Sequence, residues 1–97
     1  MAINNPEREI YLHKRRTEIG QRVKEIRRRN GWSQEDVARY LGCSRIKVNR
    51  AENGATEFSV VELELMARLF DVTILQFLDI SLSISIGGDD RKYPIPR

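Results

Sequence analysis

Apolar side chains recur at intervals of three or four residues along most of the chain, which is the spacing that one face of an α-helix requires. Ile19, Val23 and Ile26 form the first such face, and later segments repeat the pattern. Start and stop signals at the ends of these segments predict five helices. They cover about residues 18–30, 34–41, 45–53, 60–70 and 74–79. The central part of the chain is therefore expected to be all-α.

Four of the five predicted helices begin after a residue that can cap them. A serine or threonine hydroxyl at this position accepts a hydrogen bond from a backbone N–H of the first turn, which has no partner within the helix. The predicted caps are Ser33, Ser44, Ser59 and Thr73. Three residues after their caps, Glu62 and Gln76 complete capping boxes, and Asp36 is a shorter equivalent.

The predicted helix ends and the predicted core agree with these starts. A glycine, which adopts the left-handed conformation without steric cost, follows three of the segments. These glycines are Gly31, Gly42 and Gly54. Helical spacing also selects the side chains that face a core. From the second and fourth predicted helices these are Val37, Ala38, Leu41, Val60, Leu63, Met66, Ala67 and Phe70.

The first residues of the chain allow two interpretations. Pro6 follows an asparagine and suits the first position of a helix, so residues 6–16 are predicted to be helical. Leu12 lies seven residues before Ile19, which favours a backward extension of the first helix. Thr17 is equally able to cap a new helix, and the sequence alone does not decide between the two.

The last residues follow a different pattern. Apolar residues and serines alternate strictly from Ile80 to Ile86, which is typical of a strand, and two glycines then end the run. The sequence thus predicts an N-terminal extension (1–16), a helical domain (17–79) and a C-terminal strand-like tail (80–97) that is a candidate dimerisation element.

Length and composition restrict the class of protein. The chain has 97 residues, enough for a single domain, and no run of 18 uncharged apolar residues that would span a membrane. A single cysteine and a single histidine exclude an internal disulfide and a zinc site built from Cys and His. The N-terminus lacks the pattern of an export signal. We therefore expect a cytoplasmic protein without a metal or cofactor.

Charge is distributed unevenly along the chain. Residues 1–30 carry a net charge of +5 and residues 55–97 carry −3, within a total of +3. A basic front suits an anionic polymer such as nucleic acid. The cluster Lys14-Arg15-Arg16 fits either an arm that touches DNA or an ordinary helix face.

The second and third predicted helices are short and joined by Gly42-Cys43-Ser44, which is the helix-turn-helix pattern. On the third, Val48 and Ala51 point to one side. The opposite, acid-free side carries Ile46, Asn49, Arg50 and Asn53, with Arg45 and Lys47 on its flanks. In a DNA major groove, arginine pairs with guanine, asparagine with adenine, and an apolar side chain contacts the thymine methyl group.

The segment from Gly31 to Gly54, with its Ser-Gln-x-x-x-Ala, Gly-x-Ser and Glu-x-Gly elements, closely resembles the Cro/C1-type (lambda-repressor-like, XRE) helix-turn-helix family. The likeness runs from about Ile19 to Leu78 and covers all five predicted helices in order. It implies a compact five-helix domain that binds double-stranded DNA. Such a domain usually acts as a homodimeric transcriptional regulator, here a predicted repressor, on a palindromic operator.

The resemblance also assigns roles to residues. It implies that Arg45, Ile46 and Arg50 read bases and that Gln34 contacts a phosphate. The whole predicted DNA-binding set is Gln34, Ser44, Arg45, Ile46, Lys47, Asn49, Arg50 and Asn53. Arg27 and Glu52 match a charged pair that ties the first helix to the end of the third. Ala51 departs from the family pattern, which has a larger apolar residue there, so the core is expected to be thinner or filled from elsewhere.

Two alternatives remain beside a general repressor. The domain fits an antitoxin that neutralises a partner toxin through its acidic C-terminal half and regulates its own promoter. Within the DNA-binding class, it also fits a controller of restriction-modification or of a phage lysis decision. Glu62 and Glu64 point to different faces and form no catalytic pair, so no enzyme is expected. No small-molecule ligand is expected either.

Overall fold

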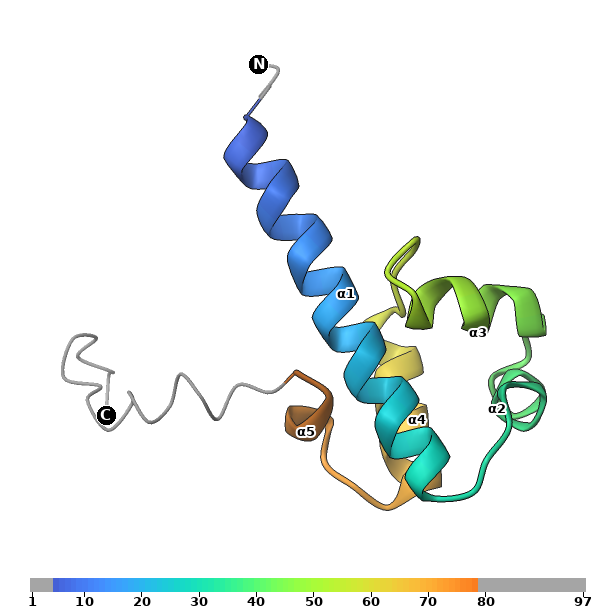
Figure 1. Ribbon diagram of the computed structural model, residues 1–97. Coiled ribbons are helices and arrows are strands. Elements are labelled where there is room, and N and C mark those ends of the chain that lie inside the picture. The colour runs from blue at the N-terminus through green and yellow to red at the C-terminus, as the bar shows by residue number, and fades with distance from the viewer. Residues whose placement is uncertain (1–4, 79–97) are drawn as a thin grey trace, which may run out of the picture.

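The computed structural model describes residues 5–78, and within this range the chain forms five helices (Figure 1). They are α1 (Pro6–Arg29), α2 (Gln34–Leu41), α3 (Arg45–Glu52), α4 (Val60–Phe70) and α5 (Ile74–Leu78). The prediction of an all-α, five-helix domain is thus confirmed. The predicted strand at 80–86 and the end of the last predicted helix at residue 79 lie outside the described residues. No helix between residues 5 and 78 is long and apolar enough to cross a lipid bilayer.

α1 is one continuous helix of 24 residues. The Oδ1 atom of Asn5 accepts hydrogen bonds from the N–H groups of Glu7 and Arg8 at 2.9 and 3.3 Å, and Pro6 occupies the first turn, where its missing N–H costs nothing. The backward extension is therefore correct, and the new start at Thr17 is wrong. The N-terminal half of α1 projects beyond the body of the domain (Figure 1).

Local hydrogen bonds start the short helices as predicted, with one exception. Ser33 and Ser59 form complete capping boxes with Asp36 and Glu62, and Ser44 caps α3 through the N–H of Lys47. Thr73 was expected to complete a box with Gln76, and this was wrong. The Gln76 side chain accepts the Thr73 N–H, but the Gln76 N–H bonds to the Thr73 carbonyl and not to its hydroxyl.

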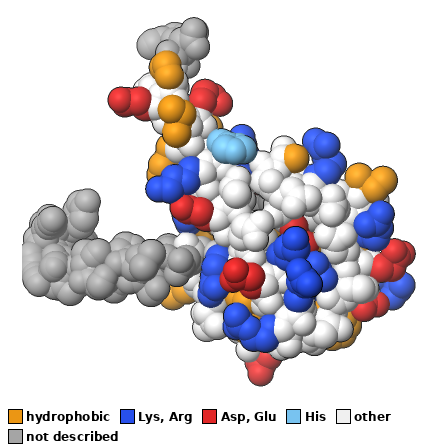
Figure 2. Space-filling model, in the orientation of Figure 1, with side chains coloured by type: hydrophobic (Ala, Val, Ile, Leu, Met, Phe, Trp, Pro, Cys, Tyr) orange, Lys and Arg blue, Asp and Glu red, His pale blue; other side chains and the backbone are white. Residues whose placement is uncertain are grey.

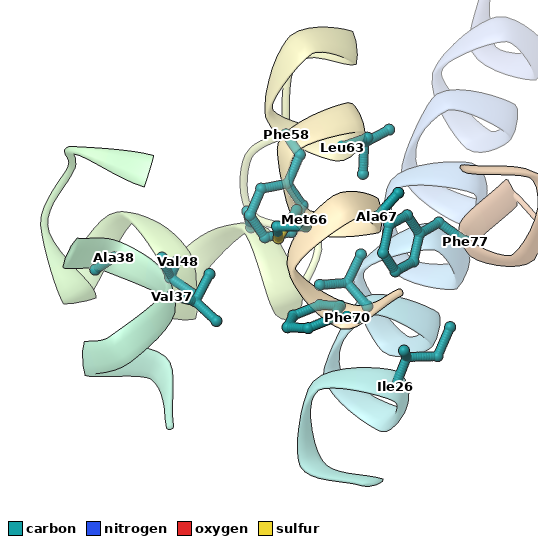
Figure 3. Packing of buried hydrophobic residues seen from close by; sticks show 12 residues of the cluster. Ile26, Val37, Ala38, Val48, Phe58, Leu63, Met66, Ala67, Phe70 and Phe77 are labelled. Carbon is teal, nitrogen blue, oxygen red and sulfur yellow. The ribbon is translucent and has the colours of Figure 1, made fainter. Parts of the chain in front are cut away.

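The core lies between all five helices (Figure 3). Val37 and Val48 join α2 to α3, while Phe70 and Phe77 meet edge to face, with ring centroids 6.1 Å apart, between α4 and α5. Val60 was predicted to face this core but is 65% exposed. It is the first residue of α4, and its side chain faces solvent.

α1 crosses the end of α3 at very short range. Gly20 is buried, and a Cβ atom at this position would lie 2.4 Å from the carbonyl oxygen of Ala51 and 2.5 Å from that of Glu52. Both oxygens belong to the backbone and cannot move aside as a flexible side chain can. The backbone of α1 therefore packs directly against the backbone at the end of α3, and only glycine fits at position 20.

Candidate nucleic-acid interface

The α2–turn–α3 unit presents one long side of α3 to solvent. Val48 and Ala51 are buried against the neighbouring helices, as the sequence predicted. Gly42 ends α2 in the left-handed conformation at φ 77°, which allows the sharp turn into the Ser44 cap. In Figure 1, α2 and α4 lie below α3, so the opposite, outer side of α3 forms the upper right edge of the domain in this view.

The outer side of α3 combines basic and apolar side chains. Arg45 and Arg50 are exposed, and Ile46 between them is 63% exposed. Among residues 5–78, no group hydrogen-bonds the Arg50 guanidinium, and no carboxylate pairs with either arginine. At the upper right of Figure 2, over α3, the coloured side chains that show are basic or hydrophobic. The arginines are thus available to an anionic ligand.

Gln34 joins two of the candidate residues on α3. Its Oε1 atom accepts hydrogen bonds from Arg45 at 3.2 Å and from Asn49 at 3.5 Å, and Asn53 donates in turn to the Oδ1 atom of Asn49 at 3.3 Å. One N–H of the Gln34 amide donates to Glu52 at 2.9 Å. The first residue of α2 therefore restrains side chains along the exposed side of α3 before any DNA is present.

A buried ion pair between Arg27 and Glu52 is hydrogen-bonded to this network through Gln34. Two nitrogens of Arg27 donate to the two carboxylate oxygens of Glu52 at 2.6 and 3.0 Å, and its third donates to the Trp32 carbonyl at 2.7 Å. The two side chains are 8% and 1% exposed. The structure thus contains the pair between α1 and the end of α3 that the resemblance implied, with Gln34 as an additional partner of Glu52.

Lys47 has a partner that the sequence did not reveal. Its Nζ atom donates to Oε2 of Glu62, on α4, at 2.5 Å. Burial alone would raise the pKa of the Glu62 carboxyl, but the hydrogen bonds from Lys47 and from Ser59 outweigh it and hold the pKa below its usual value. The carboxylate is therefore charged at neutral pH, and Lys47 lies beside it and is not free in solvent.

An open hollow of about 540 Å³ lies beside this ion pair. Arg16, Glu57 and Ser59 line it together with Lys47 and Glu62. Arg16 pairs with Glu57 at 3.5 Å. Arg15, next to it in the basic cluster at 14–16, donates to the Leu78 carbonyl at 2.9 Å and so ties α1 to α5.

The structure therefore brings the predicted residues together on and around one side of α3, in different states. Ser44 is engaged as a helix cap, and Gln34 and Asn49 are restrained by hydrogen bonds. Within residues 5–78, no group of three or more His, Cys, Asp or Glu side chains is placed to hold a metal ion. The arrangement defines a helix-turn-helix module with an exposed, cationic second helix.

Comparison with known proteins agrees with this description. The helix-turn-helix domain family matches residues 18–76 of the chain. The competence pilus inhibition repressor of Acinetobacter baylyi is 32% identical over 75 residues, which cover 77% of this chain and 68% of that protein. The crystal structure of the restriction-modification controller protein C.AhdI from Aeromonas hydrophila superposes with a TM-score of 0.58. It is 31% identical and the match covers 63% of this chain and 92% of that one.

The chain belongs to the helix-turn-helix family, and the prediction of a Cro/C1-type domain is confirmed. It is a DNA-binding transcriptional regulator and not an enzyme.

Proposed function

We propose that the chain is a sequence-specific repressor that places α3 in the major groove of double-stranded DNA. The observation that carries this proposal is the acid-free outer side of α3, where Arg45, Ile46 and Arg50 are exposed together. Arginine can donate two hydrogen bonds to a guanine edge, and isoleucine can pack on a thymine methyl group. A transcriptional regulator acts on the chromosome, so we place the protein in the cytoplasm.

The remaining candidate residues have supporting roles in this proposal. Ser44 and Asn53 lie at the two ends of α3 and Gln34 begins α2, and in this proposal all three anchor phosphates. The Gln34 amide gives one N–H to Glu52 and keeps the other for a phosphate oxygen. Asn49 contacts either a base or the backbone. Residues 5–78 offer no feature that favours a toxin as the partner over DNA.

Selection of binding sites from random duplexes tests this proposal directly. Purified protein should enrich one sequence with two-fold symmetry, because a helix-turn-helix dimer binds half-sites about 34 Å, or one turn of DNA, apart. An enriched sequence without symmetry would remove the dimer from the proposal. Recovery of unchanged random sequence would remove the sequence-specific function as a whole.

The dimer itself is proposed to form through the C-terminal tail. In the strand that the sequence predicts at 80–86, Ile80, Leu82, Ile84 and Ile86 would share one side and the serines the other. A strand with one apolar side is stabilised by pairing with another strand. The same segment of a second copy of the chain can supply that strand, related to the first by a two-fold axis. The competing surface is α5, where Leu75 is 58% exposed.

Deletion of residues 80–97 should therefore convert the dimer to a monomer and weaken binding to the selected duplex. Sedimentation gives the mass, and a titration with labelled DNA gives the affinity. Deletion of residues 89–97 alone is the matched control, since it keeps the alternating segment and should leave a dimer. If the longer deletion also stays dimeric and binds as tightly, the interface lies on α5 or elsewhere and the tail has no such role.

A further inference from the structure

Two cations, one on α3 and one on α1, are each paired with a carboxylate of the same chain. Lys47 pairs with Glu62 at 2.5 Å, and Arg16 pairs with Glu57 at 3.5 Å. All four side chains line the same hollow, which therefore carries no net charge. Arg45 and Arg50, on the outer side of α3, have no carboxylate partner among the described residues. The positive charges on the outer side of α3 are thus free of carboxylate partners within residues 5–78, whereas the charge of Lys47 on its flank is neutralised by Glu62.

Glu62 is held in place and cannot follow Lys47 toward a ligand. Its Oε1 atom accepts the Ser59 N–H at 2.9 Å in the capping box of α4, while its Oε2 atom accepts the Lys47 ammonium. The Lys47 and Glu62 side chains are 38% and 19% exposed, so their attraction is only partly screened by salt. A DNA phosphate that approaches Lys47 must break this ion pair and also meet the fixed charge of Glu62.

We propose that Glu62 is a positioning residue that withholds Lys47 from the DNA backbone and so limits the sequence-independent part of DNA affinity. The proposal rests on the proposed DNA-binding function. Attraction to phosphates supplies nearly all of the affinity for random duplex, and each phosphate contact adds to its salt dependence. With Lys47 neutralised, less of the affinity comes from phosphates, and more of it comes from the base-facing side chains of α3.

The test is the salt dependence of binding to a random duplex by the full chain. Glu62→Gln keeps an oxygen that can accept the Ser59 N–H, because glutamine also completes a capping box, but it removes the charge that holds Lys47. The slope of log affinity against log salt should become steeper by about 0.9, the value for one added phosphate contact. Affinity near 0.1 M salt should rise by about three- to tenfold, by the same relation.

Two further variants make the test specific. Glu64→Gln, at an exposed position on another face of α4, removes the same charge and is the matched control, so it should change the slope little. Lys47→Gln should leave the slope of the wild-type chain nearly unchanged. In the Glu62→Gln chain, the same replacement should remove the whole gain. A merely structural role for Glu62 would not produce this dependence on Lys47.

Three results would overturn the proposal: equal effects of Glu62→Gln and Glu64→Gln, a slope reduced by about 0.9 on Lys47→Gln alone, or a gain that survives without Lys47. Thermal melting checks that the variants are folded. If Glu62→Gln is not, Lys47→Gln alone keeps the test open, because it leaves the Ser59–Glu62 capping box in place, and a slope reduced by about 0.9 there overturns the proposal. Failure of the proposed function is distinguishable, because it would appear as a wild-type chain without preference for a selected duplex.

Discussion

Replacing Glu52 with glutamine is expected to lower the free energy of unfolding by about 3–5 kcal/mol, the range for breaking a buried ion pair on one side. The change keeps the shape of the side chain but leaves the Arg27 guanidinium buried without its counter-charge. Arg27 cannot turn to solvent easily, because its third nitrogen donates to the Trp32 carbonyl at 2.7 Å. Small domains are stable by about 5–15 kcal/mol in total, so a large share would be lost.

Chemical denaturation of four chains measures this effect. They are the wild type, Arg27→Met, Glu52→Gln and the double variant, and the double variant should lose less than the two single losses added together. Glu25→Gln is the matched control, because Glu25 pairs with Arg22 at 3.0 Å but is largely exposed, and it should cost no more than about 1 kcal/mol. Losses that simply add, or equal losses at Glu52 and Glu25, would show that the pair contributes no more than a surface pair.

Most of the fold was predictable because its signals are local. The serines at 33, 44 and 59 and the glycines at 31, 42 and 54 act on backbone groups within a few residues, and all six are used as predicted. Val60 was wrongly predicted to be buried, because periodicity identifies the inner face of a helix but not how far its neighbours extend. Thr73 does not cap α5 through its hydroxyl, because the Gln76 N–H bonds to the Thr73 carbonyl oxygen instead.

The sequence predicted which side of α3 is exposed, but not which side chains on and around it are paired with one another. Helical spacing correctly placed Ile46 and Arg50 on the exposed side of α3. The pairing of Lys47 with Glu62 was missed, although the sequence placed Glu62 at the start of α4. That contact depends on the loop between α3 and α4, where no local pattern fixes how the two helices approach each other. The link from Glu52 through Gln34 to Arg45 was missed because it joins side chains of α2 and α3 that are 18 and 11 residues apart in the chain.

Replacement of Arg50 is expected to weaken the proposed contacts between α3 and the bases of DNA. Arg50 lies in the last turn of α3, and among residues 5–78 nothing hydrogen-bonds its guanidinium, so its replacement disturbs no internal contact. A bidentate arginine–guanine contact discriminates by about 1–3 kcal/mol, or roughly five- to 150-fold in affinity. Arg50→Ala should therefore lose this much on the selected duplex and relax the preference at one base pair.

The most direct test of the central claim, that α3 reads base edges, compares this loss on two duplexes. The affinity of Arg50→Ala is measured on the selected duplex and on a random duplex at the same salt concentration, with Arg68→Ala, an exposed arginine on α4, as the control for one lost charge. We expect a large loss on the selected duplex, a small loss on the random one, and small losses on both for Arg68→Ala. Equal losses on both duplexes for Arg50→Ala would contradict the claim and reduce Arg50 to a phosphate anchor.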